Sequence, residues 1–407
     1  MSTGYLVINV FKENDSSPVS GAEIKIIGEK TDLAISTDSN GKTDKITLNT
    51  PDKELSLTPQ HEVKPYAEYT IDVKKPGLKH TIIEGIEVFE GENSIQNVYL
   101  KEDTGDKPEY IELPPHVLWG NYPPKLEEVF NVVSDNDGMR VYPSVLIPEY
   151  VVVHDGTPSN SSAANYAVRF PDYIKNVASY EIYSTWPKET IKANVLAIIS
   201  FTLNRIFTEW YTSKGNNFTI TSSTAYDQKY THNGTIFGSI SDVVDEVFNQ
   251  YIKLPNVKQP FFAQYNDGIK TNNKGWLSQW GSKSLGDQGY SALNILRYYY
   301  SNDMYITSAQ GVMGLPLSFP GFKLEVGSCG EAVQKIQNEL NVINNNYPGI
   351  PKILPANGKY EDSTRNSVRK FQEVFNLPIT GVVDFATWYK ISYIYVAVSN
   401  MLKGIYA

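Results

Sequence analysis

The N-terminal part of the chain alternates apolar and polar residues with a period of two, which is typical of half-buried β-strands. Clear examples lie at residues 21–26 and 69–73, and residues 5–11 are rich in the β-branched and aromatic residues that strands favour. Turn-forming stretches separate them, and the strongest is the Asp-Ser-Asn-Gly-Lys sequence at residues 38–42. Short strands with such turns between them predict a small β-sandwich over residues 1–102.

Charged and proline-bearing residues then predict a linker over residues 103–148, with an extended, exposed segment at residues 142–148. An α+β domain is expected over residues 149–312. Its longest helix is expected to follow an N-cap at Thr185, to hold Pro187 in its first turn and to run to about Trp210.

A Gly- and Pro-bearing stretch around residue 316 separates this region from the last part of the chain, residues 320–402. There, Val333, Ile336 and Leu340 form an apolar stripe with helical spacing, and two further helices are expected. The pattern therefore predicts a multidomain protein with an N-terminal β-sandwich, a middle α+β domain and a C-terminal three-helix domain.

Composition narrows the classes of partner. The chain has 407 residues and a net charge of −9, which argues against nucleic acid as a partner. Its single cysteine, Cys329, excludes an intrachain disulfide and a zinc site of several thiolates, and no histidine pair has metal-ligand spacing. We therefore expect no cofactor and no metal. No signal peptide and no membrane-spanning apolar run is visible.

One carboxyl group is the candidate for chemistry. Glu181 lies just before the long helix, on what the pattern predicts to be a connecting segment, with Tyr180, Ile182, Tyr183 and Trp186 around it. Apolar neighbours disfavour the charged form of a carboxyl group and raise its pKa toward neutrality, as general acid catalysis needs. On the sequence pattern alone, a glutamate in such a position is more often a solvated loop residue than a catalytic one.

A family resemblance favours the catalytic interpretation. The Val-Ala-Ser-Tyr-Glu sequence at residues 177–181, with Glu181 six residues before Pro187 of a Trp-Pro pair, resembles the catalytic motif of the stage II sporulation protein D family of peptidoglycan lytic transglycosylases. A second block, Gly-Trp-Leu-Ser-Gln-Trp-Gly at residues 275–281, is similar to that family's Gly-x-Leu-Ser-Gln-Tyr-Gly. The chain departs from the family at Asn194 and Ile199, where members often carry Gln and Arg.

The resemblance implies that Glu181 is the catalytic acid and base. A glycan hydrolase normally needs two carboxylates, whereas lytic transglycosylation can use one, because the muramic acid C6 hydroxyl takes the place of water. Candidates to bind or orient the sugar are Tyr183, Tyr226, Ser278 and Gln279. Asp227, Asp245 and Glu246 are possible second carboxylates for a hydrolase, although a solvated charged face is the commoner role for such residues.

Both ends of the chain carry further resemblances. The Asn-Gly-Lys-Tyr turn at residues 357–360 and the Thr-Gly-Val-Val-Asp sequence at residues 380–384 resemble the three-helix peptidoglycan-binding domain, with Phe371 and Trp388 expected in its core. The order Val-x-Gly-Ala-x-Ile, Asn-Gly-Lys and Tyr-x-Ile-x-Val-x-Lys in residues 19–74 is similar to transthyretin-like domains of bacterial surface proteins, which serve as spacers or binding modules.

Taken in order, these modules resemble the clostridial spore cortex-lytic enzymes. The resemblance implies a zymogen stored in the cortex or coat region of the spore, with cortex peptidoglycan as substrate. It also implies a germination protease as partner, cutting within residues 142–148 to release an N-terminal propeptide. Two alternatives remain open: a non-catalytic spore peptidoglycan-binding protein with a degenerate enzyme region, and a muramidase-type hydrolase.

Overall fold

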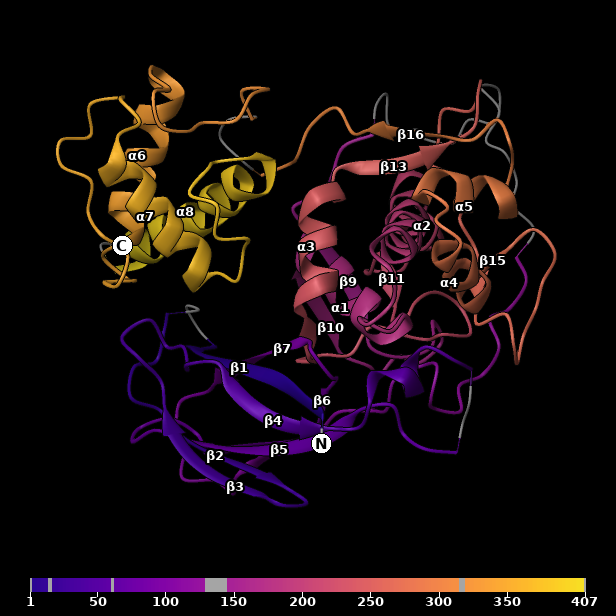
Figure 1. Cartoon of the computed structure of the whole chain (residues 1–407), viewed down its shortest axis with the longest axis horizontal. Helices are drawn as coiled ribbons and strands as arrows, with labels where there is room; N and C mark the ends of the chain where they lie inside the picture. The colour runs from indigo at the N-terminus through magenta and orange to yellow at the C-terminus, as the bar shows by residue number, and fades with distance from the viewer. Residues whose placement is uncertain (1, 14–16, 60–61, 129–144, 315–318, 406–407) are drawn as a thin grey trace.

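The computed structural model describes residues 2–13, 17–59, 62–128, 145–314 and 319–405. It contains N-terminal β-sheets, a mixed α/β middle region and a C-terminal group of helices, so the chain is multidomain (Figure 1). The N-terminal strands, drawn in indigo and violet, lie beneath the other two modules in this view.

The N-terminal module is built from two sheets. Its strands are β1 (Ser2–Lys12), β2 (Glu23–Gly28), β3 (Thr31–Ser36), β4 (Ile46–Thr50), β5 (Ala67–Lys74), β6 (Thr81–Val88), β7 (Asn93–Leu100) and β8 (Glu109–Glu112), with the 3-10 helix η1 at Lys53–Ser56. One sheet has the order β3-β2-β5-β6-β8, and the other contains β7, β1 and β4. Alternate side chains of both sheets, such as Ile8, Ile26 and Ile71, share one apolar core.

The middle region consists of helices and short strands packed around one helix. Its elements are β9 (Tyr150–His154), β10 (Asn165–Arg169), α1 (Phe170–Glu181), α2 (Lys188–Phe207), η2 (Thr212–Lys214), β11 (Ile220–Thr221), β12 (Ile236–Phe237), α3 (Gly238–Val247), β13 (Gln250–Lys253), β14 (Tyr265–Asn266), β15 (Leu277–Ser278), α4 (Gln279–Asp287), α5 (Ala292–Tyr299) and β16 (Tyr305–Ser308). Helix α2 is buried at every position from residue 193 to 205 and contacts α1, α3, α4 and α5.

The C-terminal module contains α6 (Glu331–Ile343), α7 (Asp362–Val374) and α8 (Phe385–Ile405). Val333, Ile336 and Leu340 of α6 are all fully buried, as the helical spacing in the sequence predicts. Phe371 and Trp388 are buried in the same core.

Several boundaries differ from those that the sequence pattern suggests. The stretch expected to be a linker contains β8, which pairs in parallel with β6, and Lys101 and Glu109 form an ion pair at this edge. Helix α2 ends at Phe207, earlier than expected, and its N-cap is Pro187. The hydroxyl of Thr185 does not cap it and instead lies 2.6 Å from the hydroxyl of Ser56.

The segment expected to be exposed at residues 142–148 is only partly exposed where the structure describes it, since Leu146 is exposed and its neighbours Val145 and Ile147 are buried. Val145 and Ile147 lie in the core, and the backbone N–H of Ile147 donates to the carbonyl of Gly311 at 2.9 Å. Residues 142–144 lie outside the described residues. The apolar side chains of Val145 and Ile147 explain the difference, because burying them against the middle region is more favourable than leaving them in water.

The N-terminal and middle modules share both a sheet and a core. Strand β12 of the middle region adds to β7 of the N-terminal module, so that one sheet has the order β12-β7-β1-β4. Phe89, at the end of β6, is fully buried with its ring against those of Tyr183 and Phe237 in the middle region. The indole N–H of Trp186 donates to the carbonyl of Ser56 at 2.9 Å. The two modules are therefore expected to unfold together.

This coupling gives a first prediction. Replacing Phe89 by Ala removes the aromatic contacts between the modules and should destabilise both by about 3–5 kcal/mol. The measurement is urea unfolding followed by the fluorescence of Trp186 and Trp280, which lie in the middle region. The matched control is Tyr110→Ala on β8, where the side chain is 67% exposed and little change is expected. An unchanged tryptophan transition in Phe89→Ala would show that the modules are not coupled.

Candidate active site

Glu181 is the last residue of α1 and lies inside the middle region. It does not lie on a connecting segment, as the sequence pattern suggested, because helix α1 continues through residue 181 before the chain turns at Ile182. The residue is only 4% exposed. Its apolar sequence neighbours Tyr180, Ile182 and Tyr183 are buried in the core.

Three donors from different parts of the chain contact the carboxylate of Glu181. Its Oε1 accepts a hydrogen bond from the backbone N–H of Lys229 at 2.9 Å and from the Tyr265 hydroxyl at 3.2 Å. Its Oε2 accepts from the side-chain amide of Gln279 at 3.1 Å. Polar donors therefore hold the two oxygens in fixed directions, as a group that transfers a proton requires.

Gln279 reaches Glu181 because α4 starts at this point. The hydroxyl of Ser278 accepts the backbone N–H of Gly281 at 2.9 Å and so caps α4. A Cβ at position 281 would collide with the hydroxyl of Tyr299, which explains the glycine in this motif. Of the two residues predicted from the second sequence block, Gln279 therefore contacts Glu181, and Ser278 shapes the helix that presents it.

Helix α2 holds the segments that contact Glu181. The side-chain amide of Asn194 donates to the hydroxyl of Ser282 on α4 at 2.8 Å. Further along α2, the hydroxyl of Thr202 donates to Gln228 Oε1 at 2.9 Å, and Gln228 precedes the residue whose N–H contacts Glu181. Asn194, one of the two departures from the motif described in the sequence analysis, thus makes a structural contact.

The two remaining predicted sugar-binding residues lie elsewhere. Tyr183 is buried within an aromatic cluster that includes His116, Trp186 and Trp280, so its ring packs in the core. Tyr226 is half-buried, and its backbone carbonyl accepts a hydrogen bond from Arg205. Neither contact brings the side chain to Glu181.

The three possible second carboxylates are engaged in ion pairs. Asp227 is fully buried and contacts Arg205 Nε at 2.8 Å and the Tyr211 hydroxyl at 2.7 Å, so it does not lie on a solvated face. Asp245 pairs with the buried ammonium of Lys175 at 2.7 Å. Glu246, at the surface, pairs with two lysines of α2, Lys188 and Lys192. Glu181 is thus the carboxylate of this group that has only neutral hydrogen-bond donors.

Two side chains near Glu181 carry no sequence signal that points to it. Burial and the Glu181 charge raise the pKa of Tyr265 well above its usual range, so its hydroxyl keeps its proton and donates. The ammonium of Lys125 lies 4.0 Å from the centre of the Tyr265 ring, and burial lowers its pKa to about 8 against the attraction of Glu181. Lys125 comes from the stretch expected to be a linker, where nothing in the pattern predicts a buried lysine.

Neither a metal centre nor a membrane span is visible in the described ranges. No three His, Cys, Asp or Glu side chains within them are grouped as a metal ion would require. None of the helices there combines the length and apolar character needed to cross a bilayer.

Residues 329–391 match the family model of the peptidoglycan binding domain. The match confirms the prediction for the C-terminal module, which is therefore a peptidoglycan-binding domain, formed by α6, α7 and α8. Peptidoglycan binding is thus assigned to the C-terminal domain. No curated protein matches the chain.

Solved structures give only weak likenesses. The Bacillus anthracis TIE protein is 16% identical, over 26% of this chain and 20% of that chain, with a TM-score of 0.19. The Klebsiella pneumoniae 5-hydroxyisourate hydrolase is 11% identical, over 24% of this chain and 91% of that chain, with a TM-score of 0.17. Catechol 1,2-dioxygenase from Acinetobacter sp. ADP1 is 14% identical, over 27% of this chain and 58% of that chain, with a TM-score of 0.19. None of these likenesses assigns a function to the chain.

The ion pairs of Asp227 lead to a second prediction. Asp227→Ala leaves the buried guanidinium of Arg205 with only one of its two carboxylate partners, Glu128, and should destabilise the protein by about 3–5 kcal/mol. Urea unfolding measures this loss, with the exposed Asp103→Ala as the control. A variant of unchanged stability that loses any activity on peptidoglycan would instead make Asp227 a second catalytic carboxylate.

Proposed function

We propose that the chain is a peptidoglycan lytic transglycosylase that cleaves glycan strands with Glu181 as its general acid and base. The observation that carries the proposal is the contact between Glu181 and Gln279 at 3.1 Å. These residues come from two sequence blocks far apart in the chain, and both blocks resemble the stage II sporulation protein D family. A shared structural role for Glu181 and Gln279 is the alternative, and the experiments below distinguish the two.

The proposed reaction needs one carboxyl group. Protonated Glu181 donates its proton to the glycosidic oxygen while the bond to C1 of the muramic acid breaks. The resulting carboxylate then accepts the proton of the muramic acid C6 hydroxyl, whose oxygen bonds to C1 and closes a 1,6-anhydro ring. Glu181 is protonated again at the end, and no water is consumed. The ion pairs of Asp227, Asp245 and Glu246 support this single-carboxylate scheme over a muramidase-type one.

Finer parts of the proposal follow from the module order. We propose that the N-terminal sheets form a transthyretin-like sandwich, that the middle region is a sporulation-D-like catalytic domain, and that the substrate is the cortex peptidoglycan of the spore. The protein would lie in the cortex or coat region and act during germination. The C-terminal domain supports peptidoglycan as the polymer on which the protein acts, because the family of this domain binds peptidoglycan.

The first test replaces the proposed catalytic group. Glu181→Gln keeps the shape of the side chain but cannot transfer the proton, so cleavage of cortex peptidoglycan should fall by about a hundredfold or more. Binding to the insoluble polymer should persist, because the C-terminal domain is intact. Mass spectrometry identifies the products of the active protein: anhydro-muramic ends are expected. Reducing muramic ends would mean a muramidase, and no fragments from the unchanged protein after it has been cut by the protease would mean a binding protein without activity.

The structure also supports the zymogen part of the proposal. Residues 116–128, here called the covering segment, pack against the end of α1 where Glu181 lies. The backbone N–H of Val117 donates to the carbonyl of Tyr180 at 3.1 Å, and His116 Nε2 lies 3.2 Å from the carbonyl of Ile182. These two carbonyls flank Glu181 in the sequence. Burial lowers the pKa of His116 to about 3, so its ring is neutral and donates this hydrogen bond near neutral pH.

Further contacts hold the covering segment across the site. Lys125 lies over the ring of Tyr265, Glu128 pairs with Arg205 at 2.8 Å, and the ammonium of Lys270 donates to the carbonyl of Gly120 at 3.0 Å. We propose that the segment excludes the glycan until a germination protease cuts the chain. Because Val145 and Ile147 are core residues of the middle region, the cut would fall on the N-terminal side of Val145.

The covering segment is tested in the uncut chain. Lys125→Ala removes the side chain that lies over Tyr265, so the uncut variant should digest cortex peptidoglycan measurably faster than the uncut unchanged protein. The release of soluble fragments is measured before any protease is added. Lys107→Ala, at an exposed position, is the matched control and should stay inactive. The zymogen proposal fails if the uncut unchanged protein already works at the rate of the cut form.

A further inference from the structure

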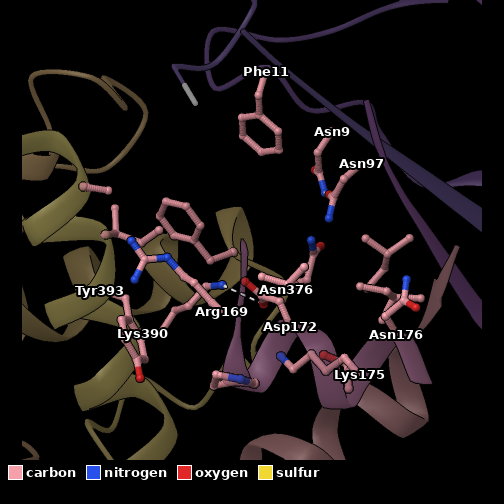
Figure 2. A pocket seen from close by; sticks show the side chains of 18 of the residues that line it. Asn9, Phe11, Asn97, Arg169, Asp172, Lys175, Asn176, Asn376, Lys390 and Tyr393 are labelled. Atoms are coloured by element: carbon pink, nitrogen blue, oxygen red, sulfur yellow. Dashed lines mark hydrogen bonds and ion pairs between the residues drawn. The ribbon is translucent and has the colours of Figure 1, made fainter. Parts of the chain in front are cut away.

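A cavity of about 500 Å³ lies where all three modules meet, apart from Glu181. Its walls come from β1 and β7 of the N-terminal module, from the start of α1 in the middle region, and from α8 of the peptidoglycan-binding domain (Figure 2). Its volume lies in the range of cavities that hold small ligands. Glu181 is not among the residues that line it.

The N-terminal wall presents two aromatic rings and two amides in a row. Strands β1 and β7 are parallel neighbours, and their register places Asn9 beside Asn97 and Phe11 beside Tyr99. Alternation puts all four side chains on the face opposite the sandwich core, which Ile8 and Val10 occupy. The rings of Phe11 and Tyr99 stack with centroids 5.6 Å apart, and Asn9 Nδ2 donates to Asn97 Oδ1 at 2.9 Å. This wall thus offers aromatic rings next to amide groups.

The opposite wall presents charges of both signs. Figure 2 shows Arg169, Asp172 and Lys390 close together on this side of the cavity. The ammonium of Lys390 lies 3.9 Å from Asp172 Oδ1, too far for a direct hydrogen bond. Arg169 Nη1 is buried, has no hydrogen bond among the described residues, and lies 3.6 Å from Glu149 Oε1. These groups keep hydrogen-bonding capacity that a charged ligand can use.

We propose that this cavity is a second peptidoglycan site, which binds one disaccharide of the glycan with its stem peptide. The stacked rings cover the apolar face of a sugar, and the two amides bond its hydroxyl and acetamido groups. Arg169 and Lys390 bind the carboxylate of the peptide, and Asp172 binds its amino group. This inference rests on the proposed function, because that function makes peptidoglycan the polymer that the chain binds. It does not depend on catalysis by Glu181.

The position of the cavity has a consequence for the uncut chain. Because β1 and β7 supply one wall, the site is complete only while the N-terminal module is in place. The N-terminal and C-terminal modules also touch directly, since the ammonium of Lys42 donates to Asn376 Oδ1 at 2.6 Å. The uncut protein would therefore be held on peptidoglycan at this junction.

The test uses the full chain with Glu181→Gln, so that the ligand is not cut, and a purified disaccharide–tetrapeptide from peptidoglycan. Titration calorimetry measures binding, and hydrogen exchange locates it. We expect protection in β1, β7 and α8. Lys390→Ala and Asn97→Ala should each weaken binding about tenfold. Lys323→Ala is the matched control, because this lysine is exposed in the C-terminal part of the chain and does not line the cavity.

Each outcome decides the proposal. Unchanged affinity in both Lys390→Ala and Asn97→Ala would overturn it, and so would protection confined to the groove between Val326 and Asp362. Loss of binding in the variants together with protection at β1, β7 and α8 would establish it. The cleavage assay on Glu181 is separate, so a failure of the proposed reaction and a failure of this site remain distinguishable.

Discussion

The burial of helix α2 is the constraint on which the middle region depends. A polar side chain inside a protein must find a hydrogen-bond partner, because leaving it unpaired costs more than the bond itself contributes. Along α2, Asn194, Thr202 and Arg205 are buried, and each bonds a different part of the chain. These bonds fix α4 and the segment around Gln228. They therefore also fix the two groups, Gln279 and the N–H of Lys229, that hold Glu181.

Apolar burial and strand pairing explain why the N-terminal module is more than an attached spacer. It contributes a fully buried aromatic ring, Phe89, to the core of the middle region, and it shares a sheet with that region through β7 and β12. The covering segment then extends from this module to the end of α1. A cut before Val145 would break the covalent link, but these contacts would still hold the two modules together. Activation would thus require the contacts to be released as well as the chain to be cut.

The buried lysine near Glu181 adds a pH dependence to this arrangement. Lys125 has a pKa lowered to about 8 where it is docked, below the value near 10.4 of a free lysine. If the covering segment is released on activation, the docked state would bind fewer protons than the released state, and docking would strengthen as pH rises from about 8 to 10.4. Below pH 8 the ammonium stays charged when it is buried, so the full free-energy cost of burying this charge opposes docking. His116 opposes docking in acid, since its ring must stay neutral down to a pKa of about 3.

Much of the secondary structure could be predicted from the sequence, because local periodicity determines it. The alternation in β2 and β5 and the helical stripe of Val333, Ile336 and Leu340 both correspond to buried faces. The turn and helix motifs of the C-terminal domain were sufficient to predict the family that the family model then matched. The boundaries are harder to predict: β8 is a charged edge strand with prolines on both sides, at Pro108 and Pro114, so this stretch has the composition of a linker.

Short motifs in the sequence are enough to predict the order of the modules and to select Glu181 and Gln279 as candidates. Only the tertiary structure decided which groups meet. It brought Gln279, Lys229 and Tyr265 to one carboxylate, paired Asp227 with Arg205, and placed Lys125 from a supposed linker beside the site. The physical reason is that these contacts join residues far apart in the chain, and long-range packing leaves no periodic trace in the sequence.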